Sequence, residues 1–380
     1  MIESRGAKRL GRGVVVLALL ALAACGAKPV ATTSVPAAVE DKVLNVLNWS
    51  DYIAPDTIEK FEKETGIKVN YDVFDSNEVL ETKLLTGRTG YDIVVPTDFF
   101  LERQAKQGIL LPLDRSKLPN YANLDPEVMK SLEGADPGNR YGIPYLGVIT
   151  GIGYNVAKVR KALGDVPIDS WAIMFDPKNA AKLKDCGFTM LDAESEVLFS
   201  SKIWLGLDPA SESVEDLKAV EAMLMKVRPY VRYFHSSQYI NDLANGETCI
   251  SLSWSGDVLQ SRDRAREAGK GVEIAFVTPK EGAMRSFDML AIPADAPHPD
   301  NAHKFINFIL RPDISAAISS FRKFPSPNLA ARKLIDPALL ADPMLFSPPE
   351  VEARLKPHRA ESLTYTRYAN RAWTRIRTGR

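Results

Sequence analysis

Strands and helices alternate through the body of this 380-residue chain, and this alternation constrains the fold more than any other feature. Residues 43–49 (VLNVLNW) are typical of a strand, and Pro55 then opens a helix that Gly66 ends. In residues 67–73 apolar side chains recur at every second position, which predicts another strand. The same order continues through residues 75–108. The pattern predicts an α/β fold whose mainly parallel sheets are covered on both faces.

A second α/β segment follows the extended stretch YGIPYLGVITGIGYN. About 340 residues are more than one hydrophobic core usually serves, so we expect two lobes with a hinge and a central cleft. Strands expected from about Val272 onward would return to the first lobe. The expected lobes are 42–147 with about 267–309, and 148–266 with about 310–380.

The first 25 residues are typical of an export leader. Four basic residues precede an apolar run, Val14–Ala24, that is too short to cross a bilayer. Small residues then precede Cys25, as in the lipobox of bacterial lipoproteins. We expect lipidation of Cys25, a flexible tether over 26–41, and a periplasmic protein anchored to a membrane. The alternative is an ordinary signal peptide that happens to contain a cysteine.

Two cysteines, Cys186 and Cys249, remain after Cys25 is set aside. In an exported and therefore oxidising compartment we expect them to form one disulfide, with two buried free thiols as the alternative.

Charge and motif content exclude several functions. Removing a leader with four basic residues and one acidic residue would leave 44 basic and 47 acidic side chains, a net charge of −3. Without a basic excess we expect no nucleic-acid partner. The histidines form no metal-binding pattern, no nucleotide-binding loop is present, and Ser320–Lys323 matches only the short SxxK spacing. We therefore expect a monomer that is not an enzyme and uses no metal or cofactor.

Acidic and aromatic residues recur together at predicted strand ends. They do so in WSDY (49–52), PTDFF (96–100), WSGD (254–257) and SFD (286–288), and LDAESE adds Glu196 before a helix. Singly, each is more often a packed aromatic ring beside a solvated carboxylate. Ligands bind beyond the carboxyl ends of strands in open α/β sheets, so these loops would share one cleft. Carboxylates and aromatic faces together favour a ligand with ammonium groups at both ends.

From about residue 44 onward the chain resembles the polyamine-binding proteins of bacterial ABC importers, most closely the putrescine-binding branch. The resemblance rests on the stretches NWSDYIAPDT, KETGIKVNYDVFDSNEVLETKL, PTDFFLERQ, ITGIGYNV, RYFHSSQYINDLANGETC, WSGDV, PKEGAM and RAWT. It implies a two-lobed periplasmic binding protein of the type II kind, which closes on its ligand and presents it to a permease. It also implies that Cys186 and Cys249 occupy the disulfide positions of the family.

The resemblance places a set of residues around the ligand, with Phe324 where the family usually has a tyrosine hydroxyl. The implied binding residues are Trp49, Ser50, Asp51, Tyr52, Thr97, Phe100, Glu196, Trp254, Asp257, Asp288 and Phe324.

Four further positions depart from the family and are candidates for specificity. Ser286 replaces a usual aromatic residue, Arg285 precedes it, and His358 stands where an apolar residue is common. Phe99 is bulky, as in the spermidine branch, whereas Asp257 favours putrescine. These features imply a lipid-anchored protein that captures putrescine, or spermidine, by hinge closure. The alternatives are an amine sensor on the same scaffold and a binder of a different cationic amine.

Overall fold

The computed structural model describes residues 40–380 of the chain. The expected leader, the lipidated Cys25 and residues 26–39 of the tether lie outside the described residues.

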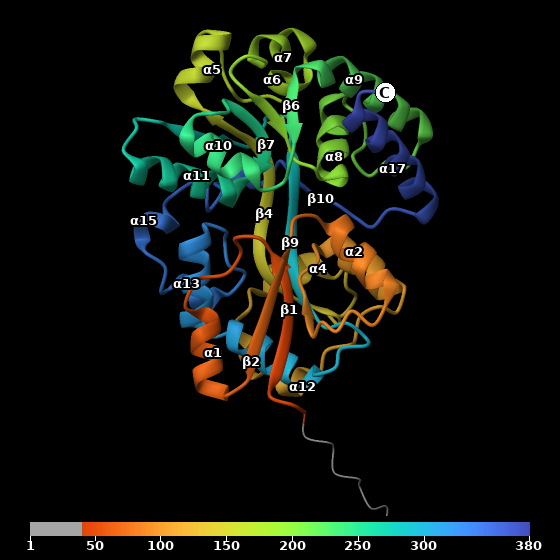
Figure 1. Cartoon of the computed structure of the whole chain (residues 1–380), viewed down its shortest axis with the longest axis vertical. Helices are drawn as coiled ribbons and strands as arrows, with labels where there is room; N and C mark the ends of the chain where they lie inside the picture. The colour runs from red at the N-terminus through yellow and green to blue at the C-terminus, as the bar shows by residue number, and fades with distance from the viewer. Residues whose placement is uncertain (1–39) are drawn as a thin grey trace, which may run out of the picture. The chain divides into compact units, whose positions relative to one another are not determined.

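Within residues 40–380, ten strands form one connected sheet, shown in Figure 1. Eight of them follow the order β2-β1-β3-β9-β4-β7-β5-β6, while β10 pairs with β9 and β8 pairs with β4. The strands are β1 (Val43–Trp49), β2 (Lys68–Phe74), β3 (Ile93–Val94), β4 (Gly142–Asn155), β5 (Phe188–Met190), β6 (Val231–Phe234), β7 (Ile250–Trp254), β8 (Ile274–Val277), β9 (Ala283–Ala291) and β10 (Leu355–Pro357).

The sheet is mixed. Its outer pairs, β1 with β2 and β3, and β5 with β6 and β7, are parallel, as the alternation of strands and helices predicted. The central pairs, which join β4 to β9, β7 and β8, are antiparallel. Residues Gly142–Ile149 of β4 pair with β9, and Thr150–Tyr154 pair with β7. β4 therefore runs continuously from one half of the sheet to the other (Figure 1).

Helices cover the sheet in both halves (Figure 1). They are α1 (Thr57–Thr65), α2 (Asn77–Thr86), α3 (Asp98–Lys106), α4 (Pro126–Leu132), α5 (Val156–Leu163), α6 (Ala172–Phe175), α7 (Pro177–Leu183), α8 (Glu194–Trp204), α9 (Val214–Val227), α10 (Gln238–Asn245), α11 (Ser255–Ala268), α12 (Pro299–Ile309), α13 (Pro312–Arg322), α14 (Leu329–Arg332), α15 (Pro337–Leu340), α16 (Pro349–Glu352) and α17 (Leu363–Thr378), with 3₁₀ turns at Arg115–Lys117, Pro119–Asn123 and Arg228–Tyr230.

Local sequence accounts for the ends of the first helices. Gly66 ends α1 in the left-handed conformation, at φ +68°, and its N–H donates to the carbonyl oxygen of Glu62. The hydroxyl of Ser76 caps α2 by accepting a hydrogen bond from the N–H of Val79. These caps place both helices close to the ranges that the sequence predicted.

Two hydrophobic cores lie on either side of the central strands. The first gathers side chains from β1–β3, the first half of β4, the second half of β9, α12 and α13, and the second gathers those of β5–β8, α5–α11 and α17. Three segments pack in a different core from their expected lobe. Ile274 and Met284 pack in the second core, as do Phe99 and Phe100, whereas Leu310 and Ile314 pack in the first. β8 therefore stays with the second half, and only β9 returns to the first. The division into lobes that move remains a prediction.

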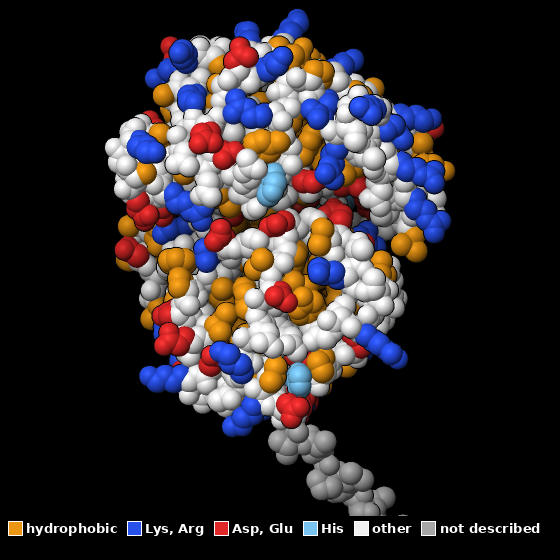
Figure 2. All heavy atoms as spheres, in the orientation of Figure 1, with side chains coloured by type: hydrophobic (Ala, Val, Ile, Leu, Met, Phe, Trp, Pro, Cys, Tyr) orange, Lys and Arg blue, Asp and Glu red, His pale blue; other side chains and the backbone are white. Residues whose placement is uncertain are grey.

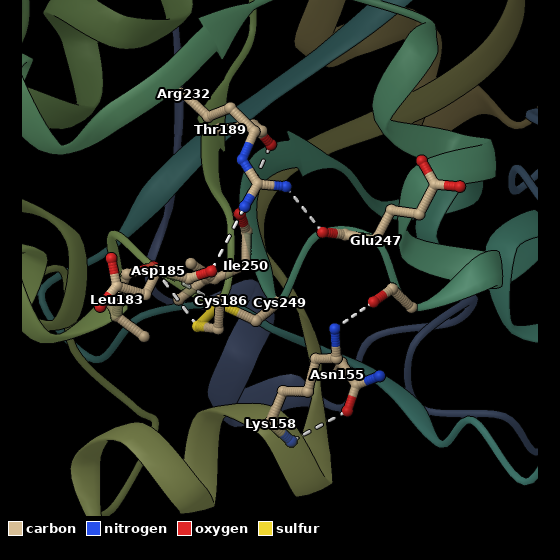
Figure 3. The surroundings of a disulfide bond; sticks show 11 residues. Asn155, Lys158, Leu183, Asp185, Cys186, Thr189, Arg232, Glu247, Cys249 and Ile250 are labelled. Atoms are coloured by element: carbon tan, nitrogen blue, oxygen red, sulfur yellow. Dashed lines mark hydrogen bonds between the residues drawn. A yellow bond between two sulfur atoms is a disulfide. The ribbon is translucent and has the colours of Figure 1, made fainter.

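Cys186 and Cys249 form the predicted disulfide, with their Cα atoms 5.4 Å apart (Figure 3). The bond joins the turn before β5 to the start of β7. The backbone reinforces the same junction, since the N–H of Cys249 donates to the carbonyl oxygen of Gly187.

Among the described residues, no helix combines the length and the apolar character that crossing a membrane requires.

Candidate functional site

A pocket lies between the two cores and contains about 490 Å³ of space unoccupied by protein atoms, part of which opens to solvent. Residues from both cores line it, and most come from loops at strand ends, as the sequence predicted. The lining residues are Trp49, Ser50, Tyr52, Asp75, Thr97, Val148, Glu196, Ser236, Ser237, Ile240, Trp254, Asp257, Ser286, Asp288 and Phe324.

Strand and helix ends position the predicted side chains. On the side of the first core, Trp49 is the last residue of β1, and Thr97 is the N-cap residue of α3. On the side of the second core, Glu196 lies in the first turn of α8, while Trp254 ends β7 and Asp257 lies in the first turn of α11. Acidic side chains in a first helical turn are favoured by the helix dipole, so the fold itself supports these two positions.

Asp288 of β9 is held by two hydroxyl groups. The Tyr52 hydroxyl donates to its Oδ2 at 2.6 Å, and the Thr97 hydroxyl donates to its Oδ1 at 2.7 Å. Asn77 in turn donates to the Thr97 hydroxyl at 2.8 Å, which fixes that donor. Burial raises the pKa of Asp288 to about 6, although the two hydroxyl hydrogen bonds act in the opposite direction.

Asp257 faces the pocket in a similar way. The Tyr239 hydroxyl donates to its Oδ2 at 2.7 Å, and the Gln260 amide donates to its Oδ1 at 3.3 Å. Burial raises the pKa of Asp257 to about 7, against the effect of the Tyr239 hydrogen bond. Glu196 is the third carboxyl group of the pocket, and burial, followed by repulsion from Glu78, raises its pKa to about 8.

Aromatic rings form the remaining walls. Trp49 and Trp254 both line the pocket and pack edge to face, with ring centroids 5.7 Å apart. The indole N–H of Trp49 donates to the carbonyl oxygen of Val95 at 2.8 Å. Tyr52 and Phe324 meet edge to face at 5.0 Å. Phe324 also lies against Gly256, where an added Cβ would come within 2.4 Å of the ring, so only glycine admits this close approach.

The pocket thus holds three buried carboxyl groups whose hydrogen-bond donors are neutral. Among the described residues, no lysine, arginine or histidine lines the pocket. A positively charged ligand would supply the missing charge, and the indole faces would favour an ammonium group. Within residues 40–380 no three His, Cys, Asp or Glu side chains are arranged to hold a metal ion.

Asp51 does not line the pocket. It adopts a left-handed conformation at φ +54°, and its half-exposed carboxylate pairs with Arg264 at 3.4 Å and with Arg322 at 3.6 Å. The expectation that Asp51 contacts the ligand is therefore not supported by its position.

Phe99, Phe100 and His358 also lie outside the pocket lining. The Phe99 ring packs against His358 at 4.6 Å, and the guanidinium of Arg103 covers the Phe100 ring at 4.4 Å. Burial lowers the pKa of His358 to about 3, so its imidazole is neutral.

Ser286 and the preceding residue, Arg285, lie on opposite faces of β9. Side chains alternate across a strand, so Ser286 and Asp288 face the pocket while Arg285 and Phe287 line a cavity on the other side. Arg285 forms an ion pair there with Glu352. The expected cation beside the ligand is therefore absent from the pocket lining, whereas the small side chain of Ser286 is present as predicted.

Five lining residues were not predicted: Asp75, Val148, Ser236, Ser237 and Ile240. Asp75 follows β2 and would have been found by the same strand-end rule that selected WSDY. Ser236 is 6% exposed, and its hydroxyl has no hydrogen-bond partner among the described residues. The repeated serine after His235 was its only sequence signal.

A pocket between two cores that continuous strands join, lined by carboxyl and aromatic groups, is typical of a solute-binding protein. The chain belongs to the bacterial extracellular solute-binding proteins, whose family model matches residues 56–346.

Relatives and solved structures agree with this class. The chain is 50% identical over 345 residues to the putrescine-binding periplasmic protein PotF of Escherichia coli (strain K12), covering 90% of this chain and 93% of that one. It is 47% identical over 374 residues to the putrescine-binding periplasmic protein SpuD of Pseudomonas aeruginosa (strain UCBPP-PA14), covering 98% and 100%. The Tp0655 (TpPotD) lipoprotein of Treponema pallidum superposes with a TM-score of 0.73 at 26% identity, covering 88% and 99%. The first two relatives are solute-binding proteins of transport rather than enzymes.

Proposed function

We propose that the protein captures a polyamine, putrescine before spermidine, in this pocket and presents it to the permease of an ABC importer. The observation that carries the proposal is the set of three buried carboxyl groups, Glu196, Asp257 and Asp288, in an aromatic pocket without a cationic side chain. The identity to relatives named for putrescine binding supports the same ligand.

Both ends of a diamine find a partner in this arrangement. Asp257 on α11 would take one ammonium group, and Asp288 on β9, with Glu196 nearby, would take the other. The methylenes between them would lie against Trp49 and Trp254, where apolar contact and the ring faces both contribute.

Closure around the ligand is the second part of the proposal. The two cores would act as lobes, and β4 and β9, which pass between them, would form the hinge. Trp254 packs against both cores, so opening would separate its contacts and expose the pocket. The core in which each residue packs sets the proposed lobe boundaries. The chain passes from the second lobe to the first at about residue 285, and it returns to the second after the end of α13.

Calorimetric titration with putrescine, spermidine, cadaverine and agmatine tests the ligand. We expect at least one of these amines to bind with micromolar affinity or better. n-Butylamine, which has a single ammonium group, should bind at least about 100-fold more weakly because one end of the pocket stays unneutralised. If none of the four amines binds, the polyamine assignment is wrong, and a different solute must be sought.

The lipid anchor is a separate part of the proposal, supported by the lipobox-like sequence before Cys25 and by the lipoprotein from Treponema pallidum. In cells fed radiolabelled palmitate, the protein should become labelled, and Cys25→Ser should abolish the label. If the wild-type protein is not labelled, the lipid anchor is ruled out and the leader is an ordinary cleaved signal peptide.

Delivery to a permease is tested in cells. A strain that lacks this protein should take up labelled putrescine more slowly, and Asp257→Asn should fail to restore uptake. Unchanged uptake, with amine binding intact in vitro, would favour the sensor over the transport function.

A further inference from the structure

A second cavity lies outside the pocket, in the groove between α2, the start of α8 and α17. Figure 2 shows acidic side chains gathered in the hollow below the position of α17. The groove contains about 960 Å³ of unoccupied space, much of it open to solvent, and shares no lining residue with the pocket. Its walls include Glu78, Asp192, Glu194, Trp373 and Arg377.

Glu194 is the unusual residue of this groove. Its side chain is 5% exposed, yet it forms no hydrogen bond or ion pair with any residue of 40–380. It reaches both the groove and a smaller adjoining cavity. A largely buried carboxylate without a protein partner depends on water, a proton or a cation in the groove to balance its charge.

The cationic side chains around the groove do not fill that role. Arg377 pairs with Asp192 at 3.1 Å, and Arg103 pairs with Glu81 at 2.6 Å. Lys83 lies on the exposed rim and forms no ion pair within the described residues.

The carboxylates that remain are Glu78 and Glu194. Burial, and after it repulsion from Glu78, raises the pKa of Glu194 to about 9, although Arg103 acts in the opposite direction. Repulsion from Glu361 adds to this, although Glu361 itself lies 3.9 Å from the buried ammonium of Lys202.

The chemistry of the groove favours an ammonium group over a metal ion. No cluster of three or more metal-binding side chains occurs in the described range. Trp373 lines the groove beside the two glutamates, and an indole face attracts an organic cation.

We propose that this groove is a second ammonium site, where Glu78 and Glu194 hold the ammonium group of a small aliphatic amine beside Trp373. The site shares no lining residue with the pocket, although its walls come from the same two halves of the molecule, α2 from the first core and α8 and α17 from the second. Because it is wider and wetter than the pocket, it would fill only at higher amine concentrations.

A putrescine titration followed by NMR tests the proposal. The indole N–H resonance of Trp373 in ¹⁵N-labelled protein is assigned with Trp373→Phe. We expect this resonance to shift in a second, weaker event after the pocket has filled. Glu194→Gln should weaken the second event at least about tenfold and leave the first within about twofold. Glu267→Gln, an exposed glutamate on α11, is the matched control and should change neither event.

Two further variants separate the possible outcomes. Asp257→Asn should remove the first event and leave the second, so that failure of the pocket and failure of the groove are distinguishable. Glu78→Gln should weaken the second event as Glu194→Gln does, and thermal melts of both variants exclude misfolding. A Trp373 resonance that does not move beyond the first event, or that moves equally in Glu194→Gln, would overturn the proposal and leave Glu194 neutralised by a proton.

Discussion

At the scale of single residues, tyrosine hydroxyl groups hold two of the carboxylates of the pocket. Tyr52 donates to Asp288 and Tyr239 donates to Asp257, in both cases from a buried ring. Each tyrosine orients its acid without neutralising it, so the charge remains available to a ligand. An acid fixed before the ligand arrives loses less conformational entropy on binding, which favours affinity.

Replacing Asp257 by asparagine should test the acid at the second-core side of the pocket. Asparagine is nearly the same size as aspartate and can still accept the hydrogen bond from Gln260, but it carries no negative charge. We expect putrescine affinity to fall by about 2–5 kcal/mol, or roughly 30-fold at least, in a calorimetric titration. Glu267→Gln on the same helix, α11, is the control and should bind as the wild type does. Unchanged binding by Asp257→Asn would place the ligand elsewhere.

Replacing Ser286 by tryptophan should test the open wall of the pocket. Ser286 faces the pocket and is 5% exposed, so a larger side chain would extend into the space beside Asp288. We expect tighter diamine binding, by about 0.5–1 kcal/mol, because an indole face is added next to the ammonium group. The same titration measures it. Weaker binding would show that the space is already needed by the ligand.

At the scale of elements, much of the fold and part of the site followed from sequence pattern. Pro55 and Gly66 predicted the ends of the first helix to within two residues of α1. The strand-end rule selected Trp49 and Trp254, and the structure places both in the pocket lining. These features are local, or depend only on where a strand ends.

What the sequence did not predict depends on partners far along the chain. Asp51 carries the same local pattern as a pocket residue, but Arg264, 213 residues away, pairs with it. Ser286 faces the pocket and Arg285 faces away from it, and the register of β9 with β4 decides which face each side chain occupies. The antiparallel centre of the sheet likewise arises from pairing between distant segments.

Replacing both Cys186 and Cys249 by alanine should test the link between two elements. The bond closes a loop with a sequence separation of 63 residues, so its loss should cost about 2–4 kcal/mol of unfolding free energy. Denaturant unfolding measures this, with reductant on the wild type as a comparison. Putrescine affinity should stay within about threefold, since neither cysteine lines the pocket. A much larger loss of affinity would mean that the bond also positions α11.

At the scale of the whole molecule, the buried acids should make stability depend on pH. The pKa values of Asp288, Asp257 and Glu196 are raised to about 6, 7 and 8, so the amine-free folded protein keeps protons that the unfolded chain has released. Its stability should therefore fall as the pH rises from about 6.5 to 8. Below about 6.5 the lowered pKa of His358 acts in the opposite direction, because the unfolded chain then binds the extra proton. Thermal melts across this range check the sign, and a melting temperature that rises with pH would contradict it.

The affinity for an amine should depend on pH in the opposite direction from the stability of the amine-free protein. An ammonium group replaces the protons of the pocket, so binding should release protons and strengthen as the pH rises from about 6 to 8. Calorimetry in buffers of different ionisation enthalpy measures the number released. Asp257→Asn should release fewer protons than the wild type, whereas an equal release would mean that other groups titrate on binding.

The hydroxyl groups around Asp288 have a consequence for the selectivity of the pocket. Sodium, potassium and magnesium ions also bind carboxylate oxygens and compete with an amine for them. Each oxygen of Asp288 already accepts one hydroxyl hydrogen bond, so a dehydrated metal ion would find few of the several oxygen ligands that it needs. The remaining lone pairs can still accept the N–H donors of an ammonium group, which also gains from a ring face. The pocket therefore favours an organic amine over an inorganic ion.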